Sequence, residues 1–264
     1  AVNVNADLAA DAKYIVMMHG NTAANIDMSA AIEQHLRTGA EITAICTETT
    51  PDYTHHRYMV EQDGFARSMM FRQTAAGPGL ASLDAYIISK ELLLSMMETC
   101  RAENRYHFHR DAIAQYLANG GKVGVYVHRG YGRRIMSTQS FFSANMDMLS
   151  SEKRAELFPP ERPVRTKTHE DVSTYYAEGS RASNSLVADG CIIEGEIDNC
   201  IISSDVRIAK GAKLDGCVVM RGAKIGEGVV MKNVVVDKAS ELSPYQTLMG
   251  SEKLPVVLPK GTKI

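Results

Sequence analysis

The C-terminal part of the chain repeats every 17 residues, and this repeat restricts the possible folds more than any other feature. Residues 199–202 (Asn-Cys-Ile-Ile), 216–219 (Gly-Cys-Val-Val) and 233–236 (Asn-Val-Val-Val) begin at that spacing, and Ile208 and Ile225 share it. Between these segments an aliphatic residue recurs every five or six residues, separated by small residues. The pattern predicts stacked triangular coils of three short parallel strands, each strand turning an aliphatic side chain inwards.

We therefore expect a left-handed hexapeptide-repeat β-helix over residues 176–264. An antiparallel sandwich with hairpin turns is the alternative, but it does not explain equal spacing over three periods. Cys191, Cys200 and Cys217 are interpreted as small buried hydrophobic residues of this segment. The last histidine is His169, before the repeat. A hexapeptide-repeat acyltransferase would thus lack its usual general base, which disfavours that function.

The first 150 residues follow a different pattern, in which short apolar runs alternate with helical stripes. Strands are expected at 14–18, 42–46, 85–89 and 123–127, and helices at 29–37, from Lys90 and at 111–118. This alternation predicts an α/β domain with a mostly parallel sheet covered on both faces. Three prolines, at 159, 160 and 163, mark residues 151–175 as a linker.

Composition excludes several classes of protein. Lys and Arg number 29 against 31 Asp and Glu, and this near-neutral balance argues against a nucleic-acid or membrane-surface binder. No run approaches the roughly 20 apolar residues that a membrane span requires. Five cysteines without CxxC or Cys/His zinc spacing favour a cytoplasmic protein with neither a disulfide framework nor a structural zinc site.

Three segments ahead of the repeat carry a resemblance to a known family: residues 14–27, 81–88 and 140–147. In this order, followed by a β-helix, they resemble the glucose-1-phosphate adenylyltransferase (ADP-glucose pyrophosphorylase) family. Those enzymes join a sugar phosphate to a nucleoside triphosphate. The resemblance implies a partial nucleotidyltransferase-like domain, because the family's Gly-rich, Arg-containing nucleotide loop has no counterpart in this sequence. We therefore expect a C-terminal portion of a longer protein.

The resemblance also places two metal-binding positions, since catalytic members hold Mg²⁺ through carboxylates. The first falls in the turn His19-Gly20-Asn21-Thr22, where Asn21 stands in place of an aspartate. Counting back from residues 144–145 puts the second at Arg134. A neutral amide and a cation replace two anions, so we expect no catalytic residue and no metal or other cofactor bound by this chain. The nearby Asp27 is expected to cap a helix.

These departures resemble the non-catalytic, GlgD-type subunit found beside the catalytic adenylyltransferase in some bacteria. They imply a regulatory subunit of glycogen biosynthesis that assembles with a catalytic adenylyltransferase subunit or self-associates through the β-helix. The alternative is an active enzyme that makes ADP-glucose from ATP and glucose 1-phosphate with relocated metal ligands.

Four arginines are candidates for anion binding. Arg72 falls near a lysine that contacts the sugar phosphate in catalytic relatives. Arg129, Arg133 and Arg134 surround two glycines and form a plausible pocket for a phosphorylated effector, with surface ion pairs as an equally good interpretation. Adjacent His55 and His56 are assigned to a solvated loop, because neighbouring residues of a strand point apart. His107 and His109 are assigned to a loop leading into a helix, with Asp111 near its first turn.

Overall fold

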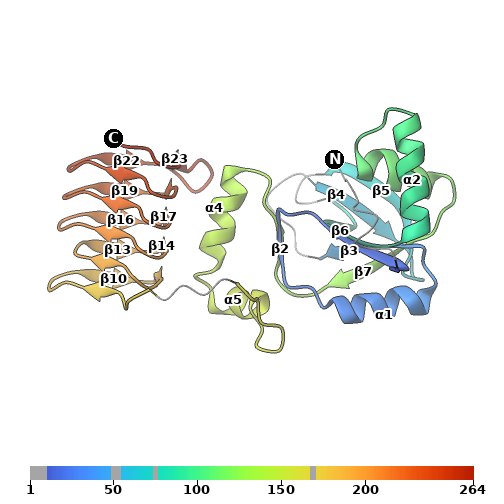
Figure 1. The fold of residues 1–264 in the computed structure, drawn as a ribbon, viewed down its shortest axis with the longest axis horizontal. Helices are drawn as coiled ribbons and strands as arrows, with labels where there is room; N and C mark the ends of the chain where they lie inside the picture. Colours follow the sequence, from blue (N-terminus) through green and yellow to red (C-terminus); the bar gives the residue numbers. More distant parts are fainter. Residues whose placement is uncertain (1–10, 49–54, 74–76, 167–170) are drawn as a thin grey trace. The chain divides into compact units, whose positions relative to one another are not determined.

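The computed structural model describes residues 11–48, 55–73, 77–166 and 171–264 (Figure 1). The chain forms two compact units that divide between Arg134 and Ile135. The division falls ahead of residue 150, so the helix that follows it belongs with the C-terminal unit. Among the described residues, no helix combines the length and the apolar character needed to cross a bilayer.

The first unit is built on a six-stranded sheet in the order β5-β4-β6-β3-β7, with β1 paired to β6. A second ladder joins two short strands, β2 and β8. The strands are β1 (Tyr14–Met18), β2 (Thr22–Ala24), β3 (Ile42–Thr47), β4 (His55–Val60), β5 (Ala66–Gln73), β6 (Leu80–Ser89), β7 (Val123–His128) and β8 (Gly132–Arg134).

The α/β class expected from the sequence is confirmed, but the sheet is mixed rather than mostly parallel. Among the described strands of this sheet, β3 and β7 form the one parallel pair. β6 runs antiparallel to β1, β3 and β4, and β4 forms an antiparallel pair with β5. β1 and β3 thus share a direction, as strands joined through a helix do, while β6 lies reversed between them. Strand–helix alternation does not reveal an inserted reversed strand.

Helices cover both faces of this sheet. α1 (Met28–Thr38) packs Ala31 and Ile32 on the face that carries Ile45 and Ile87. The opposite face is covered by α2 (Lys90–Ala102), the π-helical η2 (Phe108–Ile113) and α3 (Ala114–Ala118). The helix predicted at 29–37 matches α1 closely. It begins at the expected cap, where Asp27 Oδ1 accepts from Ala30 N at 3.0 Å, and ends at Gly39, whose φ of 63° few other residues adopt.

The second unit contains the expected β-solenoid, made of three five-stranded sheets whose strands pair in parallel. One sheet holds β9 (Tyr175–Tyr176), β12 (Ile192–Ile193), β15 (Arg207–Ile208), β18 (Lys224–Ile225) and β21 (Glu241–Leu242). The second holds β10 (Arg181–Ser183), β13 (Glu196–Asp198), β16 (Lys213–Asp215), β19 (Val230–Lys232) and β22 (Thr247–Met249). The third holds β11 (Leu186–Val187), β14 (Ile201–Ile202), β17 (Val218–Val219), β20 (Val234–Val236) and β23 (Val256–Leu258).

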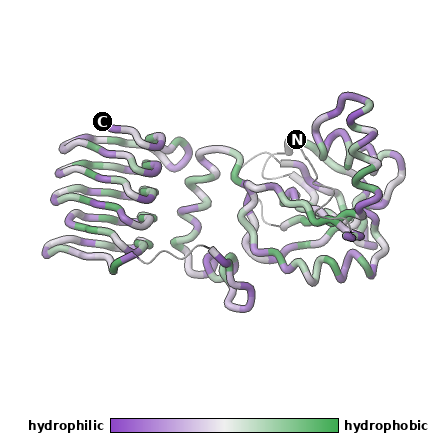
Figure 2. The backbone as a smooth tube through the Cα atoms, viewed as in Figure 1, coloured by the Kyte–Doolittle hydropathy of each residue, from purple (hydrophilic) through white to green (hydrophobic). Residues whose placement is uncertain are grey.

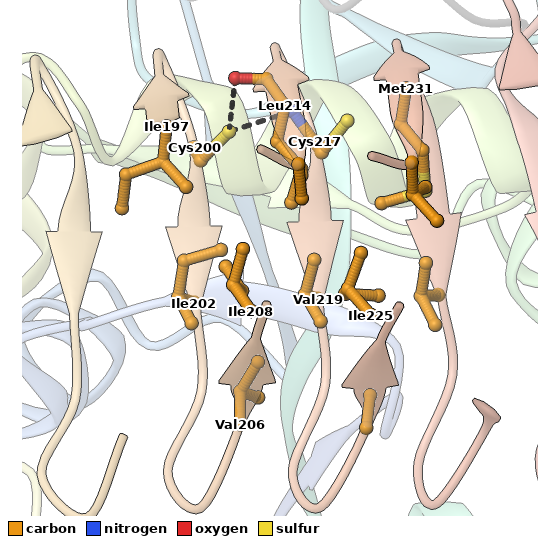
Figure 3. Packing of buried hydrophobic residues seen from close by; sticks show 14 of the residues in the cluster. Ile197, Cys200, Ile202, Val206, Ile208, Leu214, Cys217, Val219, Ile225 and Met231 are labelled. Carbon is orange, nitrogen blue, oxygen red and sulfur yellow. Dashed lines mark hydrogen bonds between the residues drawn. The ribbon is translucent and has the colours of Figure 1, made fainter. Parts of the chain in front are cut away.

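The observed strand register reproduces the sequence repeat. Ile197 pairs with Leu214, which pairs with Met231, and each of these side chains is buried in the solenoid core (Figure 3). Along each coil hydrophobic and hydrophilic residues alternate (Figure 2). The three cysteines of the solenoid are buried and free, as expected. Cys200 and Cys217 stack on successive coils, and Cys217 N donates to Cys200 Sγ at 3.4 Å.

One corner of the solenoid explains why Asn and Gly alternate at the 17-residue spacing. Asn199, Gly216 and Asn233 have φ values of 52°, 60° and 50°. This left-handed region suits glycine, and asparagine tolerates it better than most residues. At Gly216 a Cβ would come 2.8 Å from Oδ1 of the stacked Asn233, so a larger residue here would require that side chain to move.

Two helices precede the solenoid within the second unit. α4 (Thr138–Asp147) packs Phe142 against Val218 and Val235. α5 (Ser151–Leu157) lies in the segment interpreted as a linker and ends shortly before Pro159 and Pro160, which cannot continue a helix.

Candidate functional site

The two positions that the resemblance assigned to the metal site lie next to each other. β2 pairs antiparallel with β8, and Thr22 stands opposite Arg134 in that ladder. Asn21 immediately precedes Thr22. The turn is held to β6, because His19 N donates to Asp84 O at 3.1 Å and Thr22 Oγ1 donates to Leu83 O at 2.8 Å. The turn that contains Asn21 and the strand that contains Arg134 therefore lie side by side in the first unit, although they are far apart in the sequence.

Asp84, which was not among the candidate residues predicted from the sequence, lies beside Arg134. The side chain of Asp84 is fully buried, and its Oδ2 forms an ion pair with Nη2 of Arg134, which is itself 7% exposed. Asp84 has a φ of 53°, and the β3–β6 register shifts between Ile45 and Cys46, opposite this part of β6. Such an irregularity redirects side chains. A buried non-glycine residue in this conformation is strained and is held there by its surroundings.

Two histidines complete a group that we call the Asp84 cluster: Asp84, Arg134, His56 and His109. Asp84 Oδ1 lies 2.8 Å from His56 Nε2 and 3.3 Å from His109 Nδ1. The two imidazole rings stack with their centroids 4.6 Å apart. Four different elements, β4, β6, η2 and β8, supply the four side chains.

The assignment of His56 to a solvated loop is wrong, because His56 lies in β4 and is buried. Its neighbour His55 begins the same strand, and its side chain lies outside the described residues. The loop assigned to His107 is confirmed, since Asp111 Oδ2 accepts from the backbone N of both Tyr106 and His107 ahead of η2. His109, however, lies within η2 and turns into the cluster. The spacing of these residues in the sequence does not predict the contacts, because the side chains come together only through tertiary structure.

The protonation of the cluster follows from burial and charge. Burial raises the pKa of Asp84, but the hydrogen bond from His56 and the charges of His56, His109 and Arg134 outweigh it and lower the pKa overall. Burial lowers the pKa of His109 to about 4, although the Asp84 charge opposes this shift. Since His109 is then neutral near pH 7, Arg134 is the permanent cation that compensates the buried carboxylate.

Two phenols border the cluster. Tyr86 OH lies 3.2 Å from His56 Nε2 and 3.4 Å from His109 Nδ1, and Tyr58 OH donates to it at 3.4 Å. Burial raises the pKa of both phenols, so both stay protonated. The interior of the first unit therefore contains a connected polar network and not only apolar side chains.

Among the four arginines predicted to bind an anion, those whose side chains the structure describes differ in their exposure to solvent and do not form one group. Arg129 is exposed, whereas Arg133 and Arg134 are buried in β8. Successive strand residues point to opposite faces, so the guanidinium groups of Arg133 and Arg134 cannot both contact one anion on the same face. Arg134 already pairs with Asp84. The side chain of Arg72, on β5, lies outside the described residues. A phosphate site at these residues stays a prediction.

The residues at this place do not fit a magnesium ion. Mg²⁺ favours near-octahedral oxygen ligands, usually including carboxylates. Asn21 offers at most a neutral carbonyl, and the guanidinium of Arg134 contacts one oxygen of the buried Asp84 carboxylate. A divalent hard cation here would face a fixed positive charge.

Comparisons with known proteins agree with both parts of the structure. A family model described as "GlmU-like, C-terminal hexapeptide" matches residues 168–253, which cover most of the solenoid. The glycogen biosynthesis protein GlgD of Bacillus subtilis (strain 168) is 31% identical over 249 residues, which make up 94% of this chain and 63% of GlgD.

Glucose-1-phosphate adenylyltransferases match over less of the chain. The protein of Fusobacterium nucleatum is 27% identical over 209 residues, covering 77% of this chain and 54% of its own length. That of Clostridioides difficile is 25% identical over 207 residues, covering 76% and 54%. The chain thus spans between 54% and 63% of the length of these three relatives. The resemblance predicted from the sequence is confirmed: the chain is similar to the glycogen biosynthesis protein GlgD and to glucose-1-phosphate adenylyltransferases.

Proposed function

We propose that the protein is a regulatory, non-catalytic subunit of a glucose-1-phosphate adenylyltransferase in glycogen biosynthesis. The ion pair between Arg134 and Asp84 is the observation that carries this proposal. It puts a cation at one position where catalytic relatives are expected to hold their metal ion, beside the turn whose Asn21 replaces the other expected carboxylate.

Transfer of a nucleotidyl group builds negative charge on the phosphates, and a metal ion usually stabilises that charge. A single arginine cannot replace both metal-binding carboxylates and the cation they hold. Arg134 is moreover already paired with the buried carboxylate of Asp84. The chain would therefore bind substrates without turning them over, or would not bind them.

A subunit of this kind acts through its partners. We propose a catalytic adenylyltransferase subunit as the partner, with self-association through the solenoid as the competing arrangement. Arg129 and Arg133 remain candidates for contacting a phosphorylated small-molecule effector.

An active adenylyltransferase is the second candidate function, because similarity to such enzymes extends over three quarters of the chain. The alternative of a hexapeptide-repeat acyltransferase is disfavoured, because no histidine follows His169. Thermal stabilisation by acetyl-CoA, but not by sugar nucleotides, would favour that class.

The decisive assay uses the full-length protein with Mg²⁺, ATP and glucose 1-phosphate and measures released pyrophosphate. We expect no turnover by the protein alone, and we expect it to change the rate or the effector response of the catalytic subunit encoded in the same genome. Robust turnover by the protein alone would overturn the proposal, as would the absence of any effect on, or association with, the catalytic subunit.

Restoration of the metal positions provides a second test. Arg134→Asp alone would bury two carboxylates side by side, so we combine Asn21→Asp and Arg134→Asp with Asp84→Gly, which also suits the positive φ. Gain of pyrophosphate release in this triple variant supports a degenerate site. The matched control is Asn21→Asp alone, which keeps the Arg134–Asp84 pair intact and should stay inactive.

A further inference from the structure

Four potential ligand atoms surround one point in the first unit. They are His56 Nε2, His109 Nδ1, Asp84 Oδ1 and the hydroxyl oxygen of Tyr86. The three ligand atoms of the two histidines and Asp84 all lie within 4.8 Å of one another. The measured separations along this group are 2.8 Å and 3.3 Å from Asp84 Oδ1 to the two imidazoles, and 3.2 Å and 3.4 Å from Tyr86 OH to the same nitrogens.

We propose that His56, His109 and Asp84 form a binding site for a transition-metal ion of the Zn²⁺ class, with Tyr86 bordering the fourth coordination position. This inference is independent of the proposed regulatory function, which concerns the loss of a magnesium site and does not require any metal ion.

The spacing of the ligand atoms fits a tetrahedral ion. Zinc–nitrogen and zinc–oxygen bonds of about 2.0–2.1 Å separate the ligand atoms of a regular tetrahedron by about 3.3 Å. Four of the six edges of such a tetrahedron correspond to the separations above, which range from 2.8 to 3.4 Å. Zinc would therefore enter the cluster with small movements of the side chains. Two imidazoles and one carboxylate also suit Zn²⁺ and its neighbours in the first transition series rather than Mg²⁺.

The charge state of the cluster is compatible with metal binding. A ligating imidazole donates the lone pair of a ring nitrogen, and His56 Nε2 and His109 Nδ1 both lie beside Asp84 Oδ1. Arg134 contacts Asp84 Oδ2 and leaves Oδ1 towards the histidines, which fixes the carboxylate in a one-oxygen binding mode. The nearby guanidinium weakens binding of any cation, but it does not occupy the ligand position.

The cluster lies close to the surface of the first unit on the η2 side. His56 and Asp84 are 7% and 0% exposed at their side chains, but His109 is 31% exposed. A rival arrangement uses the same atoms without metal, with both imidazoles donating N–H groups to the carboxylate. Metal titration distinguishes this hydrogen-bonded arrangement from the metal-bound one.

The test uses tag-free full-length protein, stripped of metal with a chelator and titrated with Co²⁺ and Zn²⁺. We expect one Zn²⁺ per chain and an intense visible Co²⁺ spectrum typical of tetrahedral coordination, without the near-ultraviolet bands of thiolate ligands. Zn²⁺ should displace Co²⁺ at one equivalent. This readout needs no variant, so it does not depend on whether a mutant folds.

A matched pair of variants locates the ion. His109→Ala removes a ligand at a partly exposed position and should weaken Zn²⁺ binding at least ten-fold. His107→Ala removes an exposed histidine two residues away and should leave the affinity unchanged. Substoichiometric binding, a weak octahedral Co²⁺ spectrum, thiolate bands, or equal affinities of the two variants would each overturn the proposal and favour the proton-only network.

Discussion

Arg134 Nη2 and Asp84 Oδ2 form an ion pair in the interior of the first unit, with side-chain exposures of only 7% and 0%. The two residues come from different strands, β8 and β6. A pair so deeply buried contributes little net stability over an apolar pair, because both charges lose their hydration. Removal of one partner has a much larger effect, because it leaves the other charge uncompensated.

This asymmetry predicts the result of a double-mutant cycle. Arg134→Met should lower the free energy of unfolding by about 3–5 kcal/mol, as found when a buried pair loses one member. Adding Asp84→Asn should recover most of that loss, since Asn is neutral and tolerates the positive φ. Urea unfolding measures both values. Arg129→Met, at an exposed position, is the control and should stay within about 0.5 kcal/mol of the parent. Additive effects of the first two substitutions would contradict the buried pair.

Stability should fall as the pH drops from about 6.5 towards 4. In the unfolded chain His109 takes up a proton near its usual pKa of 6.5, whereas in the folded protein burial lowers that pKa to about 4. The unfolded state therefore binds more protons in this window, and acidification favours it. Unfolding curves recorded at several pH values with a chelator present measure the slope.

The matched variant for this slope is His109→Asn, which cannot titrate in the same window. It should flatten the pH dependence between 4 and 6.5. An equal slope in the variant and the parent would show that other groups cause the acid sensitivity.

The N-cap of α1 should contribute about 1 kcal/mol. Asp27→Ala removes the acceptor that binds Ala30 N at 3.0 Å and leaves that N–H without its cap. Asp27→Ser keeps a capping oxygen and should retain most of the stability. Thermal or urea unfolding compares the three proteins, and equal losses in the two variants would exclude a capping role.

A tight contact between coils predicts that the solenoid does not tolerate Gly226→Ala. A Cβ at Gly226 would lie 2.6 Å from Leu242 O, a backbone atom of the next coil. The coils would have to separate locally, with an expected loss of about 1–3 kcal/mol. Gly20→Ala is the control, because no atom lies within 4 Å of its Cβ position and its φ is not in the left-handed region. An unchanged unfolding midpoint for Gly226→Ala would contradict this packing.

The solenoid was predictable because its structure is periodic at the level of sequence. Ile197, Leu214 and Met231 repeat at the same spacing in the chain and pair in the same register in the sheet. Local rules also sufficed for α1, since Asp27 and Gly39 act within one turn of the helix ends. In each case the residues that cooperate are either close in sequence or related by a constant step.

The Asp84 cluster was not predictable for the opposite reason. His56 and Asp84 come together only because β4 and β6 pair, and their separation in sequence follows no rule. Asp84 lies within a segment that carried the family resemblance, but nothing local indicates that β6 is irregular there or turns this side chain inwards. The reversed direction of β6 was not predictable either, since the periodicity of a buried strand carries no information on its direction.

The 17-residue register shared by the middle coils has a consequence for how such a protein can change over time. Gly216 and Asn233 occupy equivalent corners, and Leu214 pairs with Met231 exactly as Ile197 pairs with Leu214. Duplication or deletion of one 17-residue unit therefore reconnects strands of identical register and preserves the triangular cross-section. Insertions and deletions can therefore lengthen or shorten the solenoid by whole coils. The α/β domain has no sequence repeat that could be added or removed in the same way.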